Sequence, residues 1–301
     1  MKRFIFSILV FIAPYFIIYV PICLFVLPNI IEKKIGISTK KQILKSFNNS
    51  KKRDYELIIM GNSGTYRGIN PDLLDIKSYN FSHDNDSYNQ IYYKLKTLKH
   101  KRINHLILGI DYFQFSYLSD TRNYIYTKLL DENYKKDYES QNEIDFFFQE
   151  TNILKFQRII FLKDIFITRQ KGIYLKENGQ YIFPGIASEK DKCIYKINRL
   201  PIQVKYFEKI LNHCKKNKIK TYLCMLPLRK NAMINYSKRQ IIEFNTFISQ
   251  YINENVILLD YSNQKKWRMS DFSDITHLNE SGANKFTKQL NDTLNVIINN
   301  K

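Results

Sequence analysis

Two short stretches of the chain carry residue types that could perform nucleophilic catalysis together. The first is Gly61-Asn62-Ser63-Gly64, which directly follows an apolar run. A serine on a sharp, glycine-flanked turn at the carboxyl end of a strand stands clear of the sheet, where backbone N–H groups can point at an oxyanion. Because residue 65 is threonine, this is not the G-x-S-x-G elbow of α/β-hydrolases. Taken alone, the pattern is more often a plain turn.

The second stretch is Asp274-Ile275-Thr276-His277, just before the last helical segment. A nucleophilic serine needs a base whose ring is oriented by a third group, and an aspartate three residues before a histidine can hold the far ring nitrogen. Of the five histidines, His277 is the one with an acidic residue at this spacing and a helix directly after it. A lone D-x-x-H is common by chance, so it is the pairing with the serine turn that favours catalysis.

An alternation of short apolar runs and longer patterned segments would position both stretches. Nearly continuous apolar runs are typical of parallel strands buried on both faces. They occur at 56–60, 78–82, 105–111, 220–225 and 255–260. Helical patterns occupy 87–99, 201–217, 237–253 and 280–298. The alternation predicts an α/β fold, a three-layer α/β/α sandwich with a parallel sheet.

The beginning of the chain predicts a membrane anchor. Lys2 and Arg3 precede residues 4–27, which are 24 residues without a charge, and about 20 such residues span a bilayer. A cleavable signal peptide would have a shorter apolar core and a small-x-small cleavage site. The two basic residues favour a cytoplasmic N-terminus, although lysines soon after the run oppose it. We predict a single-pass anchor in the cell membrane at 1–30, with the remaining chain extracytoplasmic.

Two further segments interrupt the alternation. Residues 31–53 are polar and lysine-rich and are predicted to form a stalk with a short amphipathic helix around 40–47. The domain proper is then 54–301. Residues 112–200 are rich in tyrosine, phenylalanine and lysine, with weak helical patterning around 153–167. We interpret 112–200 as an insertion folded over the carboxyl edge of the sheet, whose aromatic residues form its own small core or a sugar-binding or lid surface.

Composition excludes several classes of protein. The chain has 301 residues, 44% of them hydrophobic, which is enough for a core without disulfide or metal staples. Its net charge of +19 could suit an acidic partner. Nucleic acid is not predicted, because no nucleic-acid motif accompanies the charge. Four cysteines without CxxC spacing and an acidic turn at 83–86 without EF-hand spacing predict neither a metal nor a cofactor.

The serine and histidine stretches together resemble the SGNH (GDSL-type) hydrolase superfamily. That family pairs a Gly-Asp-Ser or Gly-Asn-Ser block after the first strand with a D-x-x-H block before the last helix. The resemblance covers residues 56–81 and 270–290. It implies a flavodoxin-like fold, in agreement with the strand pattern. It also implies a triad in which Ser63 is the nucleophile, His277 the base and Asp274 the residue that orients the base.

The chain departs from the family at the two blocks that supply further oxyanion donors. The corresponding strand ends read N-F-S-H from residue 80 and G-I-D-Y from residue 109. Beyond the backbone N–H of Ser63, the candidate oxyanion or substrate contacts are therefore Asn80 and Ser82.

An anchored chain with a Ser/Asp/His set is similar to extracytoplasmic SGNH-like proteins that act in teichoic acid D-alanylation and in alginate or peptidoglycan O-acetylation. The resemblance implies a cell-surface polymer or glycan as substrate and a multispanning membrane O-acyltransferase as partner. The leading hypothesis is a serine-dependent acyl-ester enzyme, either an O-acyltransferase or an esterase. The alternative is a catalytically inert, membrane-tethered scaffold or binding protein that recruits an O-acyltransferase.

Overall fold

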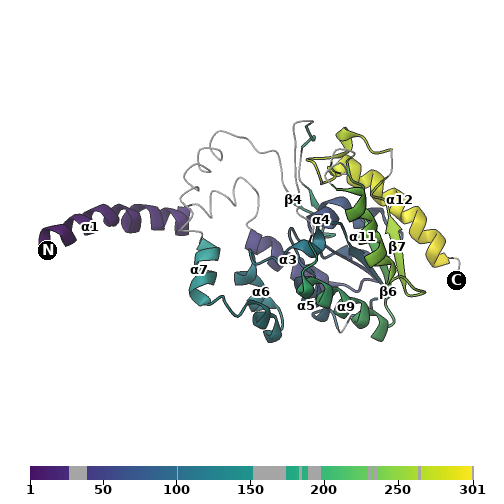
Figure 1. Ribbon diagram of the computed structural model, residues 1–301, viewed down its shortest axis with the longest axis horizontal. Coiled ribbons are helices and arrows are strands. Elements are labelled where there is room, and N and C mark those ends of the chain that lie inside the picture. Colours follow the sequence, from purple (N-terminus) through teal and green to yellow (C-terminus); the bar gives the residue numbers. More distant parts are fainter. Residues whose placement is uncertain are drawn as a thin grey trace. The chain divides into compact units, whose positions relative to one another are not determined.

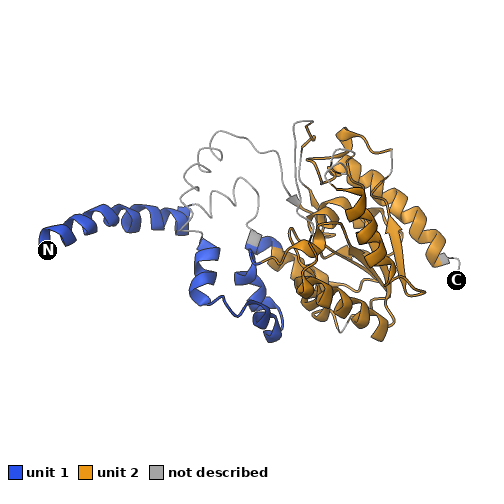
Figure 2. Cartoon of the chain, viewed as in Figure 1, with its two compact units in different colours: residues 1–42, 120–174 blue, residues 43–119, 175–301 orange. Residues whose placement is uncertain are grey.

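The computed structural model (Figure 1) describes residues 1–26, 39–99, 101–151, 174–182, 185–188, 198–229, 232, 236–263 and 266–299. The chain divides into two compact units (Figure 2). One consists of residues 1–42 and 120–174, and the other consists of residues 43–119 and 175–301.

The larger unit is built on a five-stranded sheet in the order β2-β1-β3-β6-β7. All neighbouring strands are parallel; in the register, the Cα of Ile58 pairs with those of Tyr79 on one side and Leu106 on the other. In chain order this is the 2-1-3-4-5 arrangement of flavodoxin-like folds, as the sequence predicts. The strands are β1 (Leu57–Met60), β2 (Ser78–Asn80), β3 (His105–Gly109), β6 (Lys220–Met225) and β7 (Val256–Asp260).

Helices cover both faces of this sheet, which explains why β1, β3, β6 and β7 consist mainly of apolar residues. On one face, Leu57, Ile59 and Ile107 share a core cluster with Phe286 and Leu290 of α12 (Glu280–Asn299). The opposite layer contains α5 (Tyr88–Lys96), α9 (Pro201–Lys216) and α11 (Lys238–Ser249). The arrangement confirms the predicted three-layer α/β/α sandwich.

Local sequence signals set where these helices begin. Ser87 and Ser237 each form a capping box with the glutamine three residues later, which satisfies backbone N–H groups of the first turn. Pro201 occupies the first turn of α9, where its missing N–H costs nothing. The helices therefore start where the sequence predicts them.

An apolar helix begins the smaller unit and runs from Lys2 to Val26; it is long and apolar enough to cross a membrane. It comprises α1 (Lys2–Pro14) and two wider π-helical turns, Tyr15–Tyr19 and Ile22–Val26. Each wide turn directly follows a proline, which removes one backbone donor and forces a local adjustment of this kind. The last predicted anchor residues, 27–30, lie outside the described residues.

The described helices between residues 120 and 174 belong to the smaller unit. They are α6 (Asn123–Leu129), a 3-10 segment (Glu132–Tyr138) and α7 (Glu143–Thr151). The helical patterning around 153–167 lies outside the described residues. Of the predicted insertion at 112–200, only residues 120–174 belong to the smaller unit. The flanking residues belong to the larger unit, which contains the sheet.

The predicted stalk is largely a folded helix, α3 (Thr39–Lys52). From Ile43 onward it belongs to the larger unit, where Ile43 and Phe47 are buried. Spaced four apart, these two side chains form the buried apolar face of the helix, and its third apolar residue, Leu44, is exposed. A short hairpin of β4 (Tyr174–Leu175) and β5 (Tyr181–Ile182) lies within the predicted insertion.

Candidate active site

The serine turn lies where strand β1 meets a short helix, α4 (Ser63–Gly68). Asn62 is the N-cap of this helix, and its side-chain oxygen accepts a hydrogen bond from the Gly64 N–H at 3.0 Å. A Cβ on Gly61 would lie 2.3 Å from Oγ1 of Thr65 and 3.2 Å from Cα of Gly109. Glycine is therefore required for α4 to approach the ends of β1 and β3, and this close approach fixes the position of Ser63.

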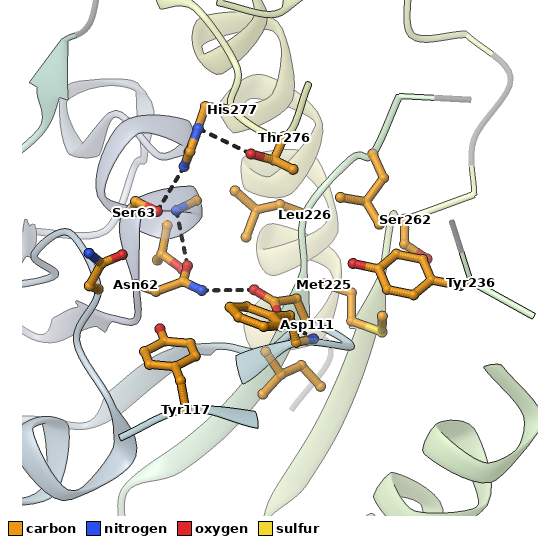
Figure 3. A pocket seen from close by; sticks show the side chains of 16 residues that line it. Asn62, Ser63, Asp111, Tyr117, Met225, Leu226, Tyr236, Ser262, Thr276 and His277 are labelled. Carbon is orange, nitrogen blue, oxygen red and sulfur yellow. Dashed lines mark hydrogen bonds between the residues drawn. The ribbon is translucent and has the colours of Figure 1, made fainter. Parts of the chain in front are cut away.

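The structure brings Ser63, His277 and Asp274 together, and Figure 3 shows Ser63 and His277 of this set. Nε2 of His277 lies 2.7 Å from Oγ of Ser63. Nδ1 of the same ring lies 2.8 Å from Oδ2 and 2.9 Å from Oδ1 of Asp274. These distances are within hydrogen-bond reach. The serine hydroxyl, the imidazole and the carboxylate are thus connected by successive hydrogen bonds.

A compact loop before α12 holds the histidine and the aspartate. Backbone N–H of Ser273 donates to the carbonyl of His277 at 2.8 Å. The backbone N–H groups of Thr276 and His277 both donate to Oδ1 of Asp274 at 2.9 Å. Asn279 closes the loop by donating from its side chain to the Ser270 carbonyl at 2.7 Å. The D-x-x-H spacing therefore produces one closed turn in which the carboxylate accepts from both backbone and ring.

Asp274 is a stable anion in this setting. Burial alone would raise its pKa, but the hydrogen bond and charge of His277 and the backbone N–H groups outweigh burial and hold the pKa of Asp274 well below its usual value. The guanidinium of Arg67 adds an ion pair, with Nη1 3.7 Å from Oδ2 of Asp274. Its Nη2 lies 3.2 Å from Oδ1 of Asp84. The carboxylate is therefore ionised at neutral pH and can stabilise a protonated imidazole.

Ser63 and His277 open into a pocket of about 180 Å³ at the carboxyl ends of the strands. It lies beside the switch point between β1 and β3, where open α/β sheets bind ligands. Much of its wall is apolar, and within the described residues no lysine or arginine lines it. The apolar side chains come mainly from the segments after β3 and β6: Ile110, Phe113, Met225, Leu226 and Leu228.

Behind the serine turn, Asn62 is tied to the segment that follows β3. Its side-chain N–H₂ donates to Oδ2 of Asp111 at 2.8 Å and also to Oε1 of Gln114. Oδ1 of Asp111 accepts from the backbone N–H groups of Phe113 and Gln114 at 2.8 and 2.6 Å. Burial raises the pKa of Asp111, and these hydrogen bonds oppose that effect. Asp111 and Gln114 thus orient Asn62, the N-cap of α4.

The two expected oxyanion contacts, Asn80 and Ser82, do not line this pocket. The side-chain N–H₂ of Asn80 donates to the carbonyls of Thr65 and Ile69 at 3.0 Å each, and its oxygen accepts from the Ser82 N–H at 3.1 Å. Both residues are fully buried. The Asn80 side chain therefore links β2 to α4 and to the residue that follows α4, and both of its N–H groups donate to backbone carbonyls.

Two residues that line the pocket, Asn85 and Asp111, were not predicted as site residues from the sequence. Asn85 lines the pocket although its sequence context reads as a polar turn. Asp111 lines it too, at the strand end where the family would have a different block. The topology of the predicted sheet could have indicated them. Asn85 and Asp111 follow the two strands that neighbour β1, and the carboxyl ends of these parallel strands lie beside Ser63.

A buried arginine, Arg229, and the single tryptophan, Trp267, make structural contacts. Nη2 of Arg229 donates to the Ser188 carbonyl at 3.1 Å, and the residue is buried. Trp267 packs against the core cluster and lies 4.7 Å, ring centroid to Nζ, from Lys285. Within the described residues, no group of three or more His, Cys, Asp or Glu side chains could hold a metal ion.

No protein-family model and no curated protein matches this chain. Among solved structures, it is similar to a Streptococcus pneumonia protein provisionally described as a platelet activating factor, at 12% identity and TM-score 0.43, covering 89% of this chain and 96% of that one. It is also similar to a family two carbohydrate esterase from Clostridium thermocellum in complex with cellohexaose, at 7% identity and TM-score 0.39, covering 82% and 66%. Similarities this low carry no conclusion about function.

Proposed function

We propose that this chain is a membrane-anchored, serine-dependent acyl-ester enzyme, an O-acyltransferase or esterase that acts on a cell-surface glycan or other envelope polymer. The observation that carries the proposal is the relay from Asp274 through His277 to Ser63, with successive contacts of 2.8 and 2.7 Å. Its position at the mouth of a pocket beside the β1/β3 switch point supports the same reading.

The geometry supports a two-step reaction. Oγ of Ser63 attacks the ester carbonyl carbon, Nε2 of His277 takes the hydroxyl proton, and the carbonyl electron pair moves onto oxygen. Collapse breaks the bond to the leaving alcohol, which takes the proton from His277. A second hydroxyl, from a sugar, a polyol or water, then attacks the acyl-serine while His277 accepts its proton. Collapse of this second intermediate breaks the bond between Ser63 Oγ and the acyl carbon, and His277 returns the proton to Oγ. Asp274 stays ionised and stabilises the imidazolium.

The pocket favours a short, uncharged acyl group. Its volume of about 180 Å³ and its apolar wall leave room for a few carbon atoms beside Ser63. A carboxylate-bearing acyl group would meet no lysine or arginine among the described lining residues, but it would meet Asp111. We propose that the polymer itself stays outside the pocket and that a multispanning O-acyltransferase supplies or receives the acyl group.

A covalent probe tests the proposal. A fluorophosphonate is expected to label the detergent-solubilised chain, because phosphonylation needs an activated serine. Mass spectrometry of the digest should place the adduct on the peptide that contains Ser63. Acyl release from p-nitrophenyl acetate should depend on the same serine, and added polyols should yield acylated polyol if transfer competes with water. A chain that takes no label while folded would contradict an enzymatic role.

Topology is tested separately. If the Lys2–Val26 helix spans the membrane with the N-terminus in the cytoplasm, trypsin added to intact cells should degrade the lysine-rich domain and leave a membrane-held stub. The control is the same digestion after the membrane has been permeabilised, which should give the same fragments in either orientation. Complete protection of the domain in intact cells would place it in the cytoplasm and remove the envelope polymer as substrate.

A further inference from the structure

The pocket offers few side-chain amides to a developing oxyanion. Among the described residues that line it, the side-chain amides are those of Asn62 and Asn85. Both amide hydrogens of Asn62 are engaged by Asp111 and Gln114. Two nearby hydroxyl groups are also engaged: that of Ser262 donates to Asp260 at 2.7 Å, and that of Thr276 lies 3.3 Å from Asp274. The Thr65 hydroxyl lines the pocket as well, and it is buried with no hydrogen-bond partner among the described residues.

Asn85 is exposed, and no hydrogen bond or ion pair joins its side chain to another residue in the described part of the chain. Its backbone is in the left-handed region, with φ of 57°. Such a conformation is uncommon outside glycine and is tolerated best by asparagine and aspartate. It turns the chain sharply after β2, at the edge of the sheet where Ser63 lies.

The residues on either side of Asn85 are held rigidly. Asp86 is fully buried, and its carboxylate accepts from Nζ of the buried Lys94 at 2.6 Å and from the His83 N–H at 3.1 Å. The carbonyl of Asp86 accepts from the Gln114 side chain at 2.7 Å. On the other side, Asp84 pairs with Arg67 at 3.2 Å. The turn is therefore fixed at 83, 84 and 86.

Two of the residues that hold this turn, Arg67 and Gln114, also contact the proposed site. Arg67, which holds Asp84, also approaches Asp274 at 3.7 Å. Gln114, which holds the Asp86 carbonyl, also accepts from Asn62, the N-cap of the nucleophile helix. The turn and the serine are thus parts of one hydrogen-bonded framework. A donor carried by such a framework needs no reorganisation during the reaction, which is what stabilisation of an oxyanion requires.

We propose that the Asn85 carboxamide is a catalytic residue that donates a hydrogen bond to the acyl oxygen as the tetrahedral intermediate forms. This inference rests on the proposed serine-dependent function. The Ser63 Oγ–carbon bond forms, the carbonyl electron pair becomes an oxyanion, and that oxygen accepts from the Asn85 amide and the Ser63 backbone N–H. The hydrogen bonds weaken again when the leaving group departs and the carbonyl reforms.

Two substitutions at this position separate a donor from a structural turn. Asn85→Gly removes the amide, and glycine adopts a positive φ without strain. Asn85→Asp keeps the shape and the tolerance of this conformation but replaces the donor with an acceptor. With the full chain in detergent and p-nitrophenyl acetate as substrate, each is expected to lower kcat by about 10²- to 10³-fold, with little change in KM.

The chain offers a matched control. Lys218 is the other described non-glycine residue with a positive φ, also 57°, and it lies before β6 at the opposite edge of the sheet. Lys218→Gly makes the same backbone change away from the pocket and should leave kcat unchanged. Thermal unfolding of all three variants shows whether they fold. If Asn85→Gly does not fold, the kcat of Asn85→Asp alone tests the donor role.

The outcomes distinguish this inference from the proposed function. If Ser63→Ala abolishes turnover while both Asn85 variants keep kcat within about threefold of the native chain, the serine mechanism stands and the role of Asn85 is refuted. If Ser63→Ala turns over the ester as well as the native chain does, both proposals fall. A loss of kcat in Asn85→Gly with full retention in Asn85→Asp would show that shape matters and that donation does not, which also refutes the inference.

Discussion

Replacement of Ser63 by alanine is expected to abolish nearly all ester turnover, with a fall in kcat of about 10⁴- to 10⁶-fold. Alanine removes the Oγ that lies 2.7 Å from Nε2 of His277. It leaves the turn intact, because Asn62 caps α4 through the backbone N–H of Gly64 and not through the serine. The measurements are acyl release from p-nitrophenyl acetate and ester modification of the envelope polymer in cells, with membrane levels of the protein determined in parallel.

Companion substitutions test whether the three residues act as a unit. His277→Ala should cost about as much as Ser63→Ala, and the double variant should be little worse than either one. Asp274→Asn should be comparable or milder, since it affects the orientation and charge of the ring. Ser249→Ala, at an exposed position at the end of α11, serves as the control and should be neutral. Normal polymer modification by Ser63→Ala at normal abundance would favour the inert scaffold.

A single methyl group at Gly282 is expected to destabilise the fold and the site together. Gly282 lies in the first turn of α12, and an added Cβ would stand 2.0 Å from the carbonyl oxygen and 2.9 Å from the carbonyl carbon of Asp271. That carbonyl also accepts from the Asn279 N–H at 3.0 Å. Alanine normally stabilises a helix by about 1 kcal/mol relative to glycine. Here the collision is with backbone, so the steric term should win.

For Gly282→Ala we expect the free energy of unfolding to fall by about 3 kcal/mol, the upper part of the range for overpacking. We also expect kcat to fall at least tenfold, because the displaced segment carries Asp274 and His277. Denaturant unfolding and the ester assay measure the two effects. The control is Ser281→Ala, an exposed position in the same turn, which should be neutral or slightly stabilising. A more stable Gly282→Ala protein would contradict the close packing of α12 on this loop.

The fold was predictable because its signals are local. The central strands β1, β3 and β6 are buried on both faces, so they appear in the sequence as short, mainly apolar runs between polar segments. The capping residues Ser87 and Ser237 and the first-turn Pro201 mark helix starts without reference to the rest of the chain. In the predicted stalk, the amphipathic pattern around residues 40–47 indicated a helix, but the burial of Ile43 and Phe47 against the larger unit can be recognised only when the partner surface is known.

The site was predictable only in part, for the same reason. Ser63 and the Asp274 to His277 turn are short motifs with their own chemistry. Asn80 has the right residue type at a strand end, but the carbonyls that occupy its amide come from α4, which folds back over β2. Asn85 depends on ties to Lys94, Gln114 and Arg67, which lie on three different segments. Contacts of this kind have no sequence pattern.

The buried pair of Lys94 and Asp86 also constrains how this sequence can evolve. Both side chains are 0% exposed, and Nζ of Lys94 lies 2.6 Å from the carboxylate and 4.5 Å from the centroid of the Phe81 ring. Loss of either partner alone would leave an uncompensated charge in the interior at a cost of about 3–5 kcal/mol, a large part of the 5–15 kcal/mol that keeps a typical domain folded. Joint replacement by apolar residues avoids that cost. Descendants of this chain should therefore keep or lose the two residues together, and lineages that have lost both must fix the turn before α5 by other means.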